Sequence, residues 1–158
     1  MYKAGVIAVQ GDVAEHAAAI RRAADRLLLP GGESTTISRL LTEEGIGEEI
    51  QAFVADGKPM LATCAGLIVV SRDAKDDRVR TLDVLDVSVD RNAFGRQKDS
   101  FEAALDVSGL DEPFPAVFIR APTIDEVGTD VEVLATVDDR PVAVRQENVL
   151  GTSFHPEL

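Results

Sequence analysis

The chain has 158 residues, 45% of them hydrophobic, a formal net charge of −12 and no tryptophan. This length suits one domain over residues 1–158, and the acidic surface disfavours nucleic acid, because phosphate contacts need clustered Lys and Arg. No apolar run approaches the roughly 18 residues of a membrane helix, and no signal-peptide pattern opens the chain. We therefore expect a cytoplasmic protein with no membrane contact. The acidic surface suits either an ordinary cytosolic protein or one kept soluble at high salt.

Apolar and amphipathic runs alternate in the first half of the chain. Strands are predicted over Ala4–Val9, Leu27–Leu29 and Pro59–Thr63. Helices are predicted over Val13–Ala24, Ser34–Leu41 and Glu48–Asp56, with a further helix beginning in Leu67–Ser71. Ser and Thr are available as caps at the start of the second helix, and Gly57 is expected to stop the third. The charged segment Arg72–Arg80 reads as a solvated loop. Later strands are predicted over Leu82–Val89, Ala103–Val107, Ala116–Ile119, Val131–Val137, Pro141–Gln146 and Val149–Ser153. This order argues for an α/β fold with a largely parallel central sheet.

Cys64 is the only cysteine, so it forms no internal disulfide and anchors no zinc site alone. It stands between a predicted strand and a predicted helix, with small residues on both sides. Such an elbow exposes a nucleophile above the sheet, near a helix N-terminus that lowers a thiol pKa. The alternative is a buried structural cysteine.

His155 and Glu157 lie at the C-terminal end of the sequence. In a strand, residues two apart share a face, so Glu157 could orient the His155 imidazole while His155 accepts the thiol proton. The alternative is a surface pair at a frayed terminus.

The run Pro30-Gly31-Gly32-Glu33-Ser34 follows a buried strand. Adjacent glycines let the backbone present N–H groups to a ligand, which suits an oxyanion hole with the Ala65 N–H as second donor. The alternative is an ordinary turn with a Ser cap.

Taken together, these segments resemble the class I (triad) glutamine amidotransferases, and among them the glutaminase subunits of pyridoxal 5′-phosphate synthases. The matching motifs spread over nearly the whole chain: Val6–Gly11, PGGEST (30–35), TCAGLI (63–68), RNAFGRQ (91–97), IRAP (119–122) and SFHPEL (153–158). RNAFGRQ discriminates best, because other amidotransferases share the elbow and the His-Pro-Glu but lack this segment. The resemblance implies a three-layer α/β sandwich with a mixed, mostly parallel central sheet.

The same resemblance implies roles for matching residues. The catalytic residues would be Cys64 as nucleophile, His155 as base and then acid, and Glu157 as its orienting partner. The substrate-binding residues would be Gly32, Glu33, Ser34, Arg91, Ile119 and Arg120, and the oxyanion residues Gly32 and Ala65. An amino-acid substrate carries a carboxylate and an ammonium, which agrees with a cation and an acceptor in this set.

The resemblance further implies L-glutamine as substrate, no metal or cofactor, and ammonia delivery to the synthase subunit of pyridoxal 5′-phosphate synthase in a hetero-oligomer. His16 would face that synthase or lie exposed on its helix. Two alternatives remain: a glutaminase subunit serving another biosynthetic amidotransferase, and a catalytically silent binding module on the same scaffold.

The sequence departs from the family pattern in three places. The Ile20–Leu27 connection is short, so either a sheet strand is absent or a segment is omitted; a parallel crossover needs a dozen or more residues, which favours omission. Ala62 stands where relatives usually have Gly, which predicts a slight adjustment of the elbow. The sequence ends at Leu158, a few residues earlier than relatives, which predicts trimming or disorder there.

Overall fold

The computed structural model describes residues 1, 3–7, 24–91 and 100–158. The predicted helix through residue 23, the interface role considered for His16 and the RNAFGRQ segment after Arg91 lie outside the described residues. The helices are α2 (Ser34–Glu43), α3 (Ile46–Ala55) and α4 (Ala65–Val70). The strands are β1 (Ala4–Val6), β2 (Arg26–Leu29), β3 (Met60–Thr63), β4 (Ser71–Asp73), β5 (Leu85–Asp90), β6 (Ser100–Leu105), β7 (Phe114–Ile119), β8 (Thr123–Val127), β9 (Glu132–Val137), β10 (Arg140–Gln146) and β11 (Val149–Thr152).

The main sheet of the described part has the strand order β1-β2-β3-β11-β10-β9. The strands β1, β2, β3 and β11 run parallel, whereas β10 pairs antiparallel with β11, and β9 pairs antiparallel with β10. The predicted α/β fold with a mixed, mostly parallel sheet is therefore confirmed. In the register, Thr63 of β3 lies opposite Thr152 of β11. The carboxyl ends of these two strands thus meet at one edge, where ligands bind in open α/β sheets.

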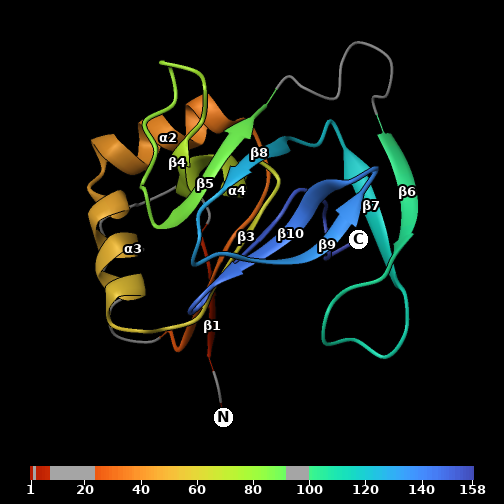
Figure 1. Cartoon of the computed structure of the whole chain (residues 1–158). Helices are drawn as coiled ribbons and strands as arrows, with labels where there is room; N and C mark the ends of the chain where they lie inside the picture. The colour runs from red at the N-terminus through yellow and green to blue at the C-terminus, as the bar shows by residue number, and fades with distance from the viewer. Residues whose placement is uncertain (2, 8–23, 92–99) are drawn as a thin grey trace.

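Helices α2 and α3 lie together on one side of the molecule, and the β6–β7 pair lies on the opposite side (Figure 1). Gly57 ends α3 as predicted: its φ is +75°, and its N–H donates to the Val54 carbonyl over 2.9 Å. The start of α2 differs from the prediction of a Ser or Thr cap. The N-cap is Glu33, whose carboxylate accepts the N–H groups of Thr35 and Thr36.

The second half of the chain builds two small sheets that the sequence did not separate. One has the order β4-β5-β8 and the other pairs β6 with β7. Strand β8 was missed, and Ser71–Asp73 is a strand where a helix end and a loop were predicted. The helix before it, α4, is only six residues long because Val70 leads directly into β4.

Two hydrophobic clusters hold these layers. The larger packs the helices and β5 on the parallel part of the main sheet. The smaller includes Phe118 of β7, Val142 of β10 and Phe154, so it fixes the β6–β7 pair to the antiparallel end of the sheet. Ring stacking of Phe118 on Phe101, with centroids 4.4 Å apart, adds to this contact. No helix in the described ranges is long and apolar enough to cross a membrane.

Candidate active site

Cys64 occupies a strained turn between β3 and α4. Its backbone angles are φ 50° and ψ −110°, which residues with a side chain seldom adopt. The turn is held from both sides, because the Cys64 N–H donates to the Thr152 carbonyl (2.9 Å) and the Ile68 N–H donates to the Cys64 carbonyl (3.3 Å). Strain of this kind costs about 1–3 kcal/mol and clusters at functional sites. The predicted strand–nucleophile–helix elbow is present.

Gly66 allows this elbow to sit against the neighbouring strand. A Cβ at position 66 would lie 2.2 Å from the carbonyl oxygen of Leu29. Because backbone atoms cannot yield as a flexible side chain does, only glycine fits at this position. The prediction that small residues flank the nucleophile for steric reasons is confirmed here.

His155 is brought to Cys64 by the adjacent ends of β3 and β11. Its N–H donates to the Val117 carbonyl of β7 over 2.9 Å, which fixes the backbone. Its Nδ1 lies 2.8 Å from Oε1 of Glu157, which leaves Nε2 for another partner. The pair meets across a turn rather than along the strand that the sequence suggested, because pairing in β11 ends at Thr152.

Gly31 shows how close the nucleophile and the histidine are. A Cβ at position 31 would lie 2.6 Å from Cε1 of His155, 3.4 Å from its Nε2 and 3.3 Å from Cβ of Cys64. One small volume beside Gly31 is therefore bounded by both catalytic candidates. A side chain at position 31 would enter the space between the imidazole and the elbow.

The Cys64 thiol is buried, with 8% of the residue exposed, and it donates toward the Ile119 carbonyl at 3.8 Å. Burial raises the pKa of this thiol above its usual value; the Ala65 N–H opposes the rise and the Glu157 charge adds to it. The lowering of the thiol pKa expected from the helix terminus is present through the Ala65 N–H, but burial outweighs it. Desolvation disfavours the thiolate more than the first turn of a six-residue helix stabilises it.

Glu33 has a carboxylate held in place by α2. It accepts the Thr36 hydroxyl and N–H, each at 2.8 Å, the Thr35 N–H at 3.2 Å and the Thr35 hydroxyl. Hydrogen bonds from the Thr35 and then the Thr36 side chains lower the pKa of Glu33 to about 2. The group is an anion at neutral pH, as an ammonium-binding residue must be.

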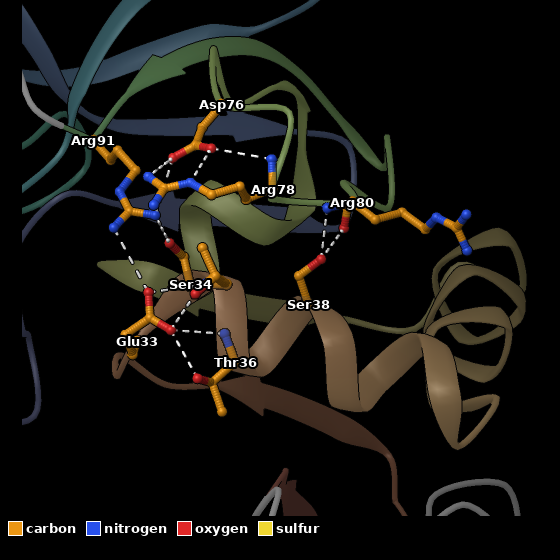
Figure 2. Close-up of polar contacts among 9 residues, drawn as sticks. Glu33, Ser34, Thr36, Ser38, Asp76, Arg78, Arg80 and Arg91 are labelled. Atoms are coloured by element: carbon orange, nitrogen blue, oxygen red, sulfur yellow. Dashed lines mark hydrogen bonds and ion pairs between the residues drawn. The ribbon is translucent and has the colours of Figure 1, made fainter.

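Arg91 follows β5 and reaches the start of α2 (Figure 2). Its Nη1 donates to the Ser34 hydroxyl at 3.3 Å, and its Nη2 lies 3.6 Å from Oε1 of Glu33. The structure thus brings together three residues that the sequence assigned to one pocket, although 57 positions separate Ser34 from Arg91. Glu33, Ser34 and Arg91 form what we call the Arg91 cluster. Since Gly31 lies beside both Cys64 and His155, the turn from Gly31 to Ser34 joins these two candidates to the Arg91 cluster.

The remaining predicted residues lie at backbone positions near Cys64. Ile119 presents its carbonyl to the thiol, and Arg120 follows with φ +46°, an exposed residue at the end of β7. Among the described residues, no hydrogen bond or ion pair joins the Arg120 side chain to the Arg91 cluster. Gly32 has φ +149°, which favours glycine, and Ala65 is the buried first residue of α4.

Asp76 is the residue that sequence reasoning missed. It lies in the segment predicted to be a solvated loop, yet its side chain is 10% exposed and its Oδ2 lies 3.2 Å from Nη1 of Arg91. No motif in the sequence marks it, since the contact depends on how the loop folds over α2. Across the described ranges, no group of three or more His, Cys, Asp or Glu side chains could hold a metal ion.

A strained cysteine elbow, a carboxylate-bound histidine and the charged pair Glu33 and Arg91 lie at the carboxyl edge of a mixed sheet, an arrangement typical of cysteine hydrolases of the triad type. Residues 22–158 match the family described as the SNO glutamine amidotransferase family. The chain belongs to this family.

Similar proteins with names agree with this family assignment. The chain is 76% identical to "Pyridoxal 5′-phosphate synthase subunit PdxT" of Natronomonas pharaonis, an alignment over 179 positions that covers all of this chain and 93% of the relative. It is 68% identical to the protein of the same name from Halobacterium salinarum, covering 98% of this chain and 87% of the relative. The 179 aligned positions exceed the 158 residues of the chain, so the first relative has residues with no counterpart here.

Solved structures show the same fold. A crystal structure of a glutamine amidotransferase, 43% identical, superposes with a TM-score of 0.86 and covers 98% of this chain and 90% of that chain. The structure of PurLQS from Thermotoga maritima superposes with a TM-score of 0.62 at 18% identity, covering 98% of this chain and 86% of that chain. The second likeness concerns the fold alone.

Proposed function

We propose that this chain is a glutaminase that hydrolyses the side-chain amide of L-glutamine to L-glutamate and ammonia. The observation that carries the proposal is the convergence at Gly31, where Cys64 and the free edge of His155 meet while Glu157 holds the other imidazole nitrogen. This arrangement supplies a nucleophile, a base and an orienting carboxylate. The whole chain, residues 1–158, acts as one amidotransferase domain.

In the proposed reaction, His155 Nε2 takes the thiol proton and the Cys64 sulfur attacks the amide carbon of glutamine. The oxyanion is stabilised by backbone N–H groups at Gly32 and Ala65. His155 then gives its proton to the departing nitrogen, and ammonia leaves. Water attacks the γ-glutamyl thioester with His155 as base, which releases glutamate and restores the thiol. No metal ion or cofactor takes part.

The substrate is held through its α-amino acid group. Arg91 binds the carboxylate, and Glu33 binds the ammonium, with Ser34 between them and the Ile119–Arg120 backbone closing the pocket. Support comes from the charges, since Glu33 is an anion at neutral pH and Arg91 is a cation at its side. An amino acid bound here would carry its side chain along Gly32 and Gly31 toward Cys64.

The ammonia is delivered to the synthase subunit of a pyridoxal 5′-phosphate synthase, in a hetero-oligomer in the cytoplasm. Two relatives at 76% and 68% identity carry the name of a subunit of that synthase, which supports this partner over the synthase of another pathway. The raised thiol pKa and the thiol's contact with the Ile119 carbonyl suit an enzyme that is inactive by itself and becomes active when substrate and partner bind. The combination of Cys64, His155 and Glu157 disfavours a silent module, which needs no such triad.

The proposal is tested by glutamate release from L-glutamine, measured for the chain alone, with its cognate synthase, and for Cys64→Ala with the synthase. We expect activity that depends on the synthase and disappears in the variant. No activity although the synthase is bound would support the silent module. No binding of the synthase would support a partner from another pathway.

A further inference from the structure

The cation of the proposed substrate pocket is held by a residue of a different loop. Asp76 lies between β4 and β5, and its Oδ2 accepts Nη1 of Arg91 at 3.2 Å. Figure 2 shows the Asp76 carboxylate directed at two guanidinium groups, those of Arg91 and Arg78. The Arg78 guanidinium donates to both oxygens of the Asp76 carboxylate, from Nε to Oδ1 at 2.9 Å and from Nη2 to Oδ2 at 2.7 Å.

The Asp76 carboxylate is fixed from the loop side. The Arg78 N–H donates to its Oδ1 at 3.0 Å, and the Val79 N–H donates to the Asp76 carbonyl at 2.9 Å. The same loop is tied to α2, because the Ser38 hydroxyl accepts the Arg80 N–H at 2.6 Å and donates to the Arg80 carbonyl at 2.7 Å. Asp76 is therefore a rigid acceptor placed over the start of α2.

The two ends of the Arg91 guanidinium have different environments. Nη1 is occupied by Asp76 and by the Ser34 hydroxyl, both fixed protein groups. Nη2 is 3.6 Å from Glu33, which is too long for a hydrogen bond. Within residues 1, 3–7, 24–91 and 100–158, no hydrogen bond occupies Nη2. The Nη2 end is therefore taken as the donor for a ligand, and the Nη1 end is the anchor. Ordering an arginine side chain costs conformational entropy. The Asp76 side chain, which is 10% exposed, already orders Arg91, so less of the substrate's binding free energy is spent on ordering it.

We propose that Asp76 is a positioning residue that holds Arg91 ready for the α-carboxylate of the substrate, and so sets the affinity of this site for α-amino acids. The inference rests on the proposed function. Asp76 does not touch the substrate; it acts through Arg91. Loss of its negative charge releases a flexible cation, and substrate binding weakens while the chemistry at Cys64 proceeds at its usual rate.

The test compares Asp76→Asn with Asp77→Asn in steady-state glutamate release by the full chain with its synthase. Asparagine at position 76 keeps an oxygen for the Arg78 N–H, so the loop retains its turn. Asp77 is an exposed neighbour, and its variant removes the same charge from the same loop. We expect Asp76→Asn to raise KM for L-glutamine about tenfold, the usual scale for one lost charge-assisted hydrogen bond, with kcat within about twofold of wild type. Asp77→Asn leaves both constants unchanged.

An unchanged or lowered KM in Asp76→Asn would overturn the proposal, since it would make Asp76 irrelevant to binding or a competitor of the substrate. A loss confined to kcat would also overturn it. Alkylation of Cys64 by iodoacetamide, which has no α-carboxylate, should proceed equally in wild type and Asp76→Asn; a changed rate would reveal general damage and contradict the assigned role.

The inference remains testable if the proposed function fails. Should the wild-type chain release no glutamate with bound synthase, the L-glutamine concentration that half-protects Cys64 from iodoacetamide replaces KM. We expect it to rise about tenfold in Asp76→Asn on the same grounds. Equal concentrations in both chains, or no protection of the wild type, would refute the role of Asp76.

Discussion

His155 Nδ1 lies 2.8 Å from Glu157 Oε1, and the two residues meet across a turn at the end of the sheet. The His155 N–H is fixed to Val117 of β7, so the imidazole is held at its backbone and at one ring nitrogen. The other ring nitrogen faces Gly31, close to the Cys64 elbow. In the proposed reaction, this relationship leaves Nε2 of His155 as the nitrogen that exchanges a proton with the thiol.

Replacing Glu157 by Gln should therefore lower kcat for glutamine roughly 10²- to 10⁴-fold, because the amide stabilises the imidazolium less and favours the wrong tautomer. KM should change little. Steady-state kinetics with the synthase checks this, with Glu112→Gln, an exposed residue of a distant loop, as the matched control. Wild-type kcat in Glu157→Gln would exclude Glu157 from the triad.

Replacing Gly31 by Ala should reduce kcat about 100-fold, with a smaller effect on stability. The new methyl group would lie 2.6 Å from Cε1 of His155 and would push the ring aside, and a displacement of about 1 Å can cost about 100-fold in rate. The ring can move, so the chain still folds. Glutamate release and a urea titration on the same preparation check both parts.

Gly66→Ala is the contrasting control for this prediction. Its methyl would meet the Leu29 backbone at 2.2 Å, and overpacking against backbone costs about 1–3 kcal/mol or more. The variant should lose unfolding free energy by that amount. If Gly31→Ala were instead fully active, the His155 ring would not occupy the space that the structure gives it.

Much of this arrangement could be predicted from the sequence. The elbow at Cys64 follows from a short motif whose local backbone chemistry is specific, whereas the grouping of Arg91 with Glu33 and Ser34 was implied by the family resemblance. Two features could not be predicted. The buried contact of Asp76 with Arg91 depends on a loop fold, and the raised thiol pKa depends on burial by segments far away in sequence, including the strand end at Ile119.

In the secondary structure too, local sequence patterns predicted most elements but not those that depend on tertiary contacts. Strand β8 was missed because Thr123–Val127 is short and its last three residues, among them Asp125 and Glu126, are exposed. Its pairing with β5 is a tertiary contact that no local pattern reveals. The cap of α2 was assigned to a hydroxyl residue by propensity, whereas Glu33 forms it through its longer side chain.

Glu33 predicts an acid dependence of stability. Its pKa falls from an ordinary 4.5 to about 2 in the folded chain, so its stabilising effect is full above pH 4.5 and is lost as pH falls from 4.5 toward 2. Glu33→Ala should cost about 1 kcal/mol at pH 7, the usual scale of an N-cap. The difference from wild type should shrink below pH 4.5.

Urea titrations of wild type, Glu33→Ala and Glu44→Ala at several pH values measure this effect. Glu44 is an exposed glutamate at the other end of α2, so its removal leaves the first turn of the helix unchanged. A Glu33→Ala difference that stayed constant from pH 7 to pH 2 would contradict the depressed pKa.

The Cys64 thiol predicts a second pH dependence. Because burial raises its pKa, the isolated chain carries a neutral thiol at pH 7, and only thiolate reacts with iodoacetamide. Alkylation at pH 8 should be slower than that of free cysteine, and should rise steadily through pH 9. Mass spectrometry at timed intervals gives the rate. A plateau below pH 8 would mean a thiolate already formed in the resting chain.

We propose above that Cys64 attacks the side-chain carbonyl of glutamine. The most direct measurement is the intact mass of the chain, with its synthase bound, after exposure to a chloroketone analogue of L-glutamine. We predict one adduct, blocked by excess L-glutamine and absent in Cys64→Ala, with glutamate release falling in proportion to labelling. Because Cys64 is the only cysteine, the adduct's position follows from the variant. An unlabelled chain in an intact complex would contradict the claim and leave a silent binding module.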